Sequence, residues 1–174
     1  MGHSAASLAN LDLATLAERL GRRCREQGVT LTTAESCTGG GVASAITAVA
    51  GSSDYFETGY VTYSNAAKAR LLGVPTALIE AHGAVSSEVV EAMVAGACRD
   101  SGASLGVAIS GVAGPGGGSD DKPVGTVWLA FGDEHRQSSV CHHFPGDRRA
   151  VRERAVREAL VGLIRVVEAE APVG

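Results

Sequence analysis

The chain has no long apolar run and no excess of basic residues. Hydrophobic residues make up 45% of its 174 residues, yet no run approaches the ~20 that span a bilayer, and the first residues lack a secretory-signal pattern. The formal net charge of −4 argues against general nucleic-acid binding, which depends on Lys and Arg neutralising phosphates. We therefore expect a cytoplasmic protein with no membrane or nucleic-acid partner.

Cysteine and histidine are too few and too scattered to suggest a metal centre. The four cysteines form no CxxC pair and no zinc-finger spacing. The neighbouring His142 and His143 would point to opposite faces of a strand and would not chelate one ion together. We expect reduced thiols, no metal and no cofactor.

Lysine is scarcer still, and the few lysines present are candidates for acid–base chemistry. Of the 15 basic residues, only Lys68 and Lys122 are lysines. Arginine keeps its proton in proteins, whereas a buried lysine can lose it. Each lysine is therefore a candidate for acid–base chemistry, the alternative being an ordinary surface lysine.

The hydrophobic pattern predicts alternating strands and helices in one domain covering residues 1–174, with 1–9 as a flexible tail. Strands are expected at 29–34, 56–63, 105–109, 125–131 and 135–144, the last two as a hairpin. Helices are expected at 10–27, after Gly41 as far as Ala48, after a cap at Ser64 or Asn65, from Pro75, after a cap at Ser86 or Ser87, and from about Asp147. The predicted fold is α/β, a three-layer α/β/α sandwich with a mixed sheet.

Glycine is abundant, with 23 residues, and it clusters in two turns that each follow a predicted strand. Ligands of open α/β sheets bind at such strand ends. In the first turn Ser36 precedes Cys37, Thr38, Gly39 and Gly40, whose N–H groups could stabilise an oxyanion. The alternative is that Ser36 or Thr38 simply caps the following helix.

A serine nucleophile needs a base to take its proton. Lys68 could be that base if burial lowered its pKa toward neutrality, and the Tyr63 hydroxyl could orient or relay the proton. The competing nucleophile is Cys37, which is intrinsically more reactive when ionised.

The second glycine-rich turn spans residues 110–118 and lacks the GK[ST] ending of a Walker motif. Its backbone N–H groups could still form an anion nest, and arginines at the start of the last predicted helix could complete a phosphate site. The alternative for each arginine is a solvated helix residue. The candidates for phosphate binding are Gly116, Gly117, Arg148, Arg149 and Arg152.

Several ordered motifs together resemble the CinA carboxy-terminal domain family. They are TAESCTGG at 33–40, YSNAAK at 63–68, GAVS at 83–86, SGVAGPGG at 110–117, KPVGTV at 122–127 and GDR at 146–148. The resemblance covers the chain from about residue 10 to 167. It implies that Ser36 is the nucleophile, Lys68 its general base and Tyr63 an assisting hydroxyl, with Ser110 and Gly111 contacting substrate. Ser110 stands where many relatives have threonine.

Stand-alone members of this family are serine–lysine amidohydrolases that convert nicotinamide mononucleotide (NMN) to nicotinic acid mononucleotide and ammonia. The resemblance thus implies a small-molecule substrate, NMN, and no cofactor. We also expect a homo-oligomer, since small α/β enzymes are often symmetric assemblies. Two alternatives remain: a non-catalytic nucleotide-binding module, and an amidase for another small carboxamide.

Overall fold

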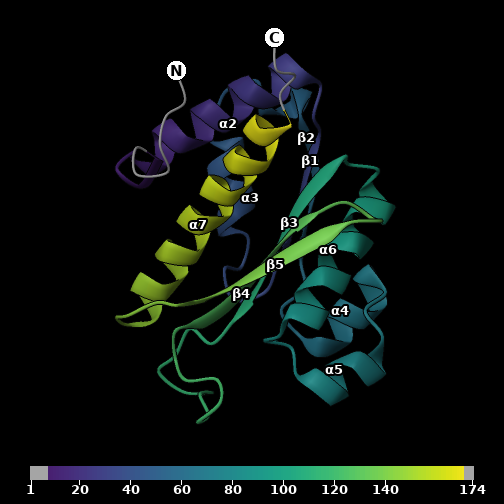
Figure 1. The fold of residues 1–174 in the computed structure, drawn as a ribbon, viewed down its shortest axis with the longest axis vertical. Coiled ribbons are helices and arrows are strands. Elements are labelled where there is room, and N and C mark those ends of the chain that lie inside the picture. Colours follow the sequence, from purple (N-terminus) through teal and green to yellow (C-terminus); the bar gives the residue numbers. More distant parts are fainter. Residues whose placement is uncertain (1–7, 171–174) are drawn as a thin grey trace.

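A five-stranded sheet lies between two layers of helices in the computed structural model, which describes residues 8–170 (Figure 1). The strand order is β2-β1-β3-β4-β5, with β1 parallel to β2 and β3, and β4 antiparallel to β3 and β5. The predicted α/β/α sandwich with a mixed sheet is therefore confirmed. The strands are β1 Leu31–Glu35, β2 Phe56–Val61, β3 Leu105–Gly111, β4 Thr126–Gly132 and β5 Gln137–His143.

In the described residues, helices lie in two layers, one on each face of the sheet. One layer packs around the carboxy-terminal helix and holds α2 Leu13–Gln27, α3 Gly41–Thr47 and α7 Arg148–Ala169. The other holds α4 Asn65–Leu72, α5 Thr76–His82 and α6 Ser87–Ser101. A single 3-10 turn, η1 Ser52–Asp54, leads into β2.

Side-chain caps fix where the longer helices begin. Asp12, Ser64, Ser86 and Asp147 each accept a hydrogen bond from the backbone N–H three residues ahead, over 2.7–3.3 Å. Such a bond satisfies a donor that the first helical turn leaves free and contributes about 1 kcal/mol. Of the two caps considered for α4 and for α6, the structure uses Ser64 and Ser86.

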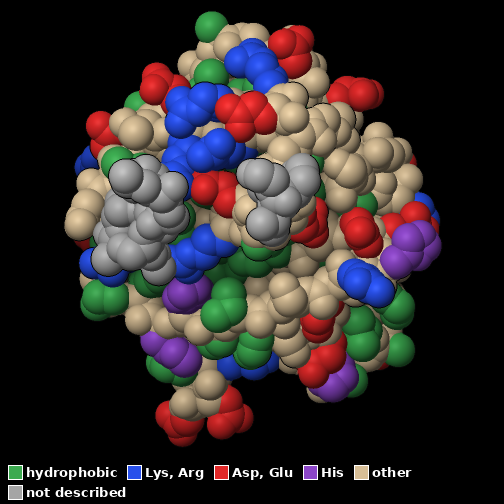
Figure 2. Space-filling view, turned by 45° about the horizontal axis from the view of Figure 1, so that its top comes forward, with side chains coloured by type: hydrophobic (Ala, Val, Ile, Leu, Met, Phe, Trp, Pro, Cys, Tyr) green, Lys and Arg blue, Asp and Glu red, His purple; other side chains and the backbone are tan. Residues whose placement is uncertain are grey.

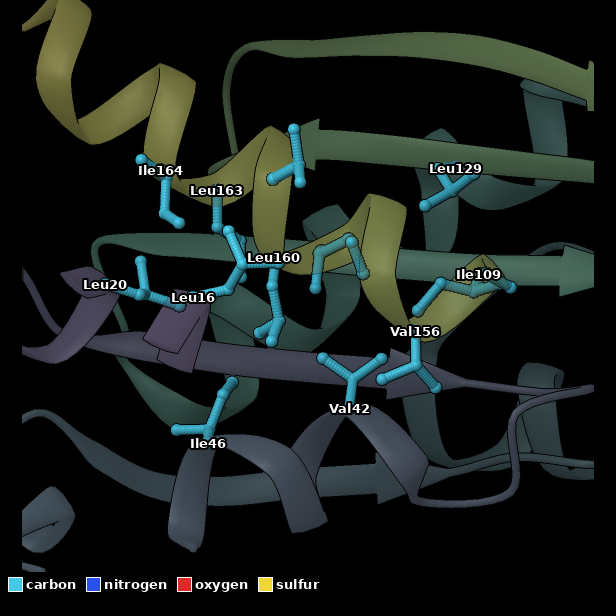
Figure 3. Packing of buried hydrophobic residues seen from close by; sticks show 14 of the residues in the cluster. Leu16, Leu20, Val42, Ile46, Ile109, Leu129, Val156, Leu160, Leu163 and Ile164 are labelled. Atoms are coloured by element: carbon cyan, nitrogen blue, oxygen red, sulfur yellow. The ribbon is translucent and has the colours of Figure 1, made fainter. Parts of the chain in front are cut away.

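The hydrophobic core is divided by the sheet into two parts. In Figure 3, Leu160 of α7 lies beside Leu16 of α2 in front of the sheet, in the part of the core that also holds Leu20 and Ile164. The second part lies beneath α6, where Ala108 of β3 packs. β3 is buried on both faces, which explains why residues 105–109 of the sequence are continuously apolar.

The structure moves the ends of some predicted elements. β1 begins two residues late because the Val29 N–H bonds back to the Cys24 carbonyl behind Gly28, which has a φ of 66°. β5 begins at Gln137 because the Asp133 carboxylate accepts from the N–H groups of residues 135 and 136 and forms a turn there.

The predicted flexible tail at 1–9 is partly corrected. Residues 1–7 lie outside the described residues, but Leu8 is 5% exposed within the core, and Arg157 donates hydrogen bonds to the carbonyls of Leu8 and Ala9. The packing of the Leu8 side chain and the hydrogen bonds from Arg157 to the backbone hold residues 8 and 9 in place.

Acidic and basic side chains are intermixed on the face shown in Figure 2. The pair of Arg19 and Glu168 joins α2 to α7 through two hydrogen bonds of 2.7 and 2.8 Å. Between residues 8 and 170, no helix is long and apolar enough to cross a membrane.

Candidate active site

Ser36 and Lys68, which are 32 residues apart, meet where β1 ends. The Ser36 N–H donates to the Ile109 carbonyl of β3 over 2.9 Å, which continues the pairing of β1 with β3. Lys68 lies in the first half of α4, and its Nζ is 3.0 Å from Ser36 Oγ. Sheet pairing and the α4 cap together place the amine against the hydroxyl.

Two carbonyl oxygens hold the Lys68 amine in place. Lys68 Nζ donates to Thr62 O over 3.0 Å and to Tyr63 O over 3.2 Å. The residue is 1% exposed, and burial lowers the pKa of its amine from the ordinary value of 10.5. Among the described residues, no carboxylate lies within ion-pair distance of Nζ to oppose this shift.

In the structure Lys68 Nζ donates to Ser36 Oγ as well, and the Ser36 hydroxyl donates to the Tyr63 carbonyl, but the same positions also accommodate a neutral lysine. A neutral amine has two hydrogens and one lone pair, so donating to both carbonyls leaves the lone pair free for the Ser36 hydroxyl. The Ser36 O–H can then donate to Nζ, as transfer of its proton to a base requires.

The turn after Ser36 leaves some of its N–H groups available. Gly39 N–H donates to Ser36 O and Gly41 N–H to Thr38 O, each over 3.0 Å. The Gly39 N–H is therefore already used within the turn. Within the described chain, the N–H groups of Cys37, Thr38 and Gly40 donate to no backbone or side-chain oxygen.

Glu35 stabilises this turn through hydrogen bonds to its carboxylate, a role that the sequence analysis missed. Its carboxylate is fully buried and accepts from Thr38 Oγ1 over 2.6 Å, Val42 N over 2.8 Å and Ala43 N over 3.1 Å. It thereby caps α3 and fixes the Thr38 side chain. An acidic residue seven positions before a helical residue gives no sequence signal of this kind.

Cys37 is poorly placed to compete as nucleophile. Its side chain is 5% exposed, and burial raises the pKa of its thiol to about 11. A thiol with that pKa is almost fully protonated near neutral pH.

Tyr63 meets the site through its backbone rather than its hydroxyl. Its carbonyl accepts from Lys68 Nζ and, over 3.4 Å, from Ser36 Oγ. Its side chain is 60% exposed, and its hydroxyl accepts from Arg148 Nη2 over 3.1 Å.

The second glycine-rich turn approaches the same end of the sheet. Ser110 and Gly111 end β3, and Ser110 is 2% exposed. Arg148 Nη1 donates to Gly114 O over 3.0 Å, which ties the turn to the start of α7. Gly116 and Gly117 lie farther along the turn and are exposed.

The three candidate arginines of α7 point to different partners. Arg148 bridges Gly114 and Tyr63, as above, and Arg152 donates to the carbonyls of Cys37 and Thr38. Arg149 is highly exposed and pairs with Glu153 over 2.9 Å. All three line a cavity of about 530 Å³, together with Ala113, Pro115, Val124, Gly146 and Asp147.

No group of three or more His, Cys, Asp or Glu side chains in residues 8–170 is arranged to hold a metal ion. The site therefore offers a hydroxyl, an amine, free N–H groups and guanidinium groups. These are the components of an acyl-transfer centre beside an anion site.

Comparison with known proteins shows the family of this chain. The domain model described as the CinA C-terminal domain matches residues 13–167. The chain belongs to the CinA C-terminal domain family. As a CinA-family chain, it carries the Ser36 turn and Lys68 inside the matched region, and the predicted resemblance is confirmed.

Relatives of this CinA-family chain span most of its length. The protein of Pseudomonas putida named nicotinamide-nucleotide amidohydrolase PncC is 61% identical over 154 residues, which are 88% of this chain and 96% of the relative. The Escherichia coli K12 protein of the same name is 49% identical, with coverages of 88% and 93%. A crystal structure of a CinA-superfamily protein from Klebsiella pneumoniae matches with a TM-score of 0.88 and 39% identity, covering 91% of this chain and 99% of the other.

Proposed function

We propose that this protein hydrolyses the carboxamide of nicotinamide mononucleotide, with Ser36 as nucleophile and Lys68 as general base. The observation that carries the proposal is the 3.0 Å contact between Lys68 Nζ and Ser36 Oγ at a lysine that is 1% exposed. The names of the P. putida and E. coli relatives support the substrate.

The first half-reaction forms an ester. Neutral Lys68 takes the Ser36 proton while Oγ attacks the carboxamide carbon, and the free N–H groups of the turn stabilise the oxyanion. Lys68 then returns the proton to the leaving nitrogen, so that the C–N bond breaks and ammonia departs. Of the residues proposed for the oxyanion, Cys37, Thr38 and Gly40 have N–H groups that donate to no oxygen of the described residues.

The second half-reaction consumes water. A water molecule gives a proton to Lys68 and attacks the ester, and Lys68 passes that proton back to Ser36 Oγ as the bond to the acyl group breaks. The products are nicotinic acid mononucleotide and the regenerated enzyme.

The nucleotide phosphate is proposed to bind in the cavity at the start of α7. Its guanidinium groups, Arg148, Arg149 and Arg152, and the exposed glycines Gly116 and Gly117 supply charge and N–H groups suited to a phosphate. Ser110 and Gly111 are proposed to contact the substrate, and Tyr63 to assist through the carbonyl that holds Lys68.

We also propose, from the sequence, that residues 1–174 act as one domain, in the cytoplasm and as a homo-oligomer. Light scattering on the purified protein tests the assembly, and cell fractionation tests the location.

The proposal is tested by ammonia release from NMN and from a panel of other small carboxamides. We expect Ser36→Ala to lower kcat for NMN by at least about 10³-fold with the fold intact, as loss of a nucleophile does. Near-normal turnover by Ser36→Ala refutes the mechanism. Binding of NMN without ammonia release points to a non-catalytic nucleotide module, and faster release from another amide points to a different substrate.

A further inference from the structure

The Thr38 N–H is a buried donor without an acceptor. Thr38 is 1% exposed, its hydroxyl donates to Glu35, and its carbonyl accepts from Gly41 N–H. Within residues 8–170, its N–H donates to no backbone or side-chain oxygen. Buried backbone donors are rarely left without a partner, so this group is held in place by contacts elsewhere in the turn.

Those contacts come from Arg152 on the opposite side of the peptide. Arg152 Nε donates to Cys37 O over 3.1 Å, and Nη2 is 3.4 Å from Thr38 O. The Cys37–Thr38 peptide bond is trans, so its N–H and C=O point in opposite directions. A guanidinium that binds the Cys37 carbonyl therefore turns the Thr38 N–H away from α7.

We propose that Arg152 is a positioning residue that keeps the Cys37–Thr38 peptide oriented so that its N–H serves as an oxyanion donor. The inference rests on the proposed function, in which Ser36 attacks beside this peptide. If the peptide flipped, the carbonyl would face the developing negative charge, and a stabilising donor would become a repelling acceptor.

The arginines differ in a way that favours this role for Arg152. Arg148 binds Gly114 and Tyr63, and Arg149 binds Glu153 on the helix surface. Of these three, Arg152 is the one that contacts the Ser36 turn, with two of its nitrogens committed to carbonyl oxygens there. Glu35 accepts a hydrogen bond from the Thr38 hydroxyl, so Glu35 holds the side chain of this residue while Arg152 holds the backbone of the turn.

Steady-state kinetics on NMN separate positioning from phosphate binding. Arg152→Gln is compared with Arg154→Gln, a matched change at an exposed position of the same helix. We expect Arg152→Gln to lower kcat by about 10- to 100-fold, somewhat less than the loss of a whole oxyanion donor, while Arg154→Gln leaves kcat unchanged. A kcat within threefold of wild type, with or without a raised KM, overturns the inference.

Chemical rescue excludes a merely structural loss. Ethylguanidinium added to Arg152→Ala is expected to restore kcat at least severalfold, because it supplies the same planar donors, and to have no such effect on Ser36→Ala. If Arg152→Ala remains folded by circular dichroism and ethylguanidinium leaves its low kcat unchanged, positioning by the guanidinium is overturned.

A substrate-independent readout keeps this inference separate from the proposed function. A fluorophosphonate is attacked by a serine Oγ with loss of fluoride, and its rate depends on the nucleophile and the oxyanion donors but not on a nicotinamide site. We expect Arg152→Gln to slow labelling of Ser36 about tenfold or more. If Arg152→Gln is labelled slowly and the wild type releases no ammonia from NMN, the positioning role of Arg152 is supported and NMN is refuted as the substrate. If Arg152→Gln is labelled at the wild-type rate, only the positioning role is refuted. If Ser36 of the wild type is not labelled at all, the positioning role and the proposed serine mechanism are both overturned.

Discussion

Replacing Lys68 by Met separates the chemistry of the amine from the space that its side chain fills. Both side chains are unbranched and similar in length, so a thioether can fill the space of the Lys68 side chain, which is 1% exposed. The substitution removes the group that lies 3.0 Å from Ser36 Oγ. It also leaves the carbonyls of Thr62 and Tyr63 without this donor.

The expected cost to catalysis follows from the loss of a general base. Such a loss lowers the rate by about 10²- to 10⁴-fold, equivalent to roughly 3–5 kcal/mol on the barrier. Each carbonyl left without a donor costs about 1–3 kcal/mol of folding free energy, partly offset because no amine must then be desolvated. Since typical domains are stable by 5–15 kcal/mol, we expect the variant to remain folded.

The assay is ammonia release at saturating NMN, with circular dichroism to confirm the fold. Lys122→Met is the matched control, because Lys122 is the other lysine of the chain and its Nζ bonds to the His82 carbonyl away from Ser36. We expect Lys122→Met to keep wild-type kcat. If folded Lys68→Met kept more than about a tenth of wild-type kcat, the assignment of Lys68 as the base would be wrong.

The pH dependence gives a second measurement on the same residue. Burial lowers the pKa of Lys68 below 10.5, so the active neutral amine forms as pH rises through that lowered pKa. We expect kcat/KM to rise with pH on an acid limb that Lys68 sets, and to level off before pH 10.5. The free energy of unfolding also rises with pH in this range. Between the folded pKa of Lys68 and 10.5 the unfolded chain binds more protons than the folded chain, so folding becomes more favourable as pH rises. An acid limb that is identical in wild type and in the residual activity of Lys68→Met would contradict this reasoning.

Two further predictions test the rival nucleophile and the packing. Cys37→Ser is expected to keep kcat within about threefold, and iodoacetamide to modify Cys37 slowly near neutral pH, because the thiol pKa is raised to about 11; rapid inactivation with protection by NMN would revive Cys37 as nucleophile. Gly96→Ala is expected to destabilise the protein by about 1–3 kcal/mol in urea unfolding, because the new Cβ would lie 1.9 Å from the Leu72 carbonyl oxygen; an unchanged or raised midpoint would show that α4 and α6 can move apart at little cost.

The sequence predicted the pairing of Ser36 with Lys68 but not what holds the pair. The strand before Ser36 and the cap before α4 are local features, and parallel strands bring their carboxyl ends to one edge. The two carbonyls that bind Lys68 depend on how the chain bends between β2 and α4. Every residue type has a carbonyl, so no residue type marks such a bend in advance.

The arginines show the same limit more sharply. A run of basic residues at the start of α7 predicted an anion site, but helical spacing does not say which carbonyl or carboxylate each side chain reaches. Arg149 and Arg152 are three positions apart, yet one pairs with Glu153 and the other reaches across to the Ser36 turn. The partner that a long side chain reaches depends on how the helices and the sheet pack together, and helical spacing alone does not determine this.

The two backbone carbonyls that bind the Lys68 amine make the contact tolerant of side-chain substitutions. Because the oxygens of Thr62 and Tyr63 that receive its hydrogens belong to the main chain, exchanging either of those side chains leaves the acceptors in place. An insertion or deletion between β2 and α4 would move both oxygens at once. The length of this connection, more than the identity of its residues, therefore fixes where the Lys68 amine is held.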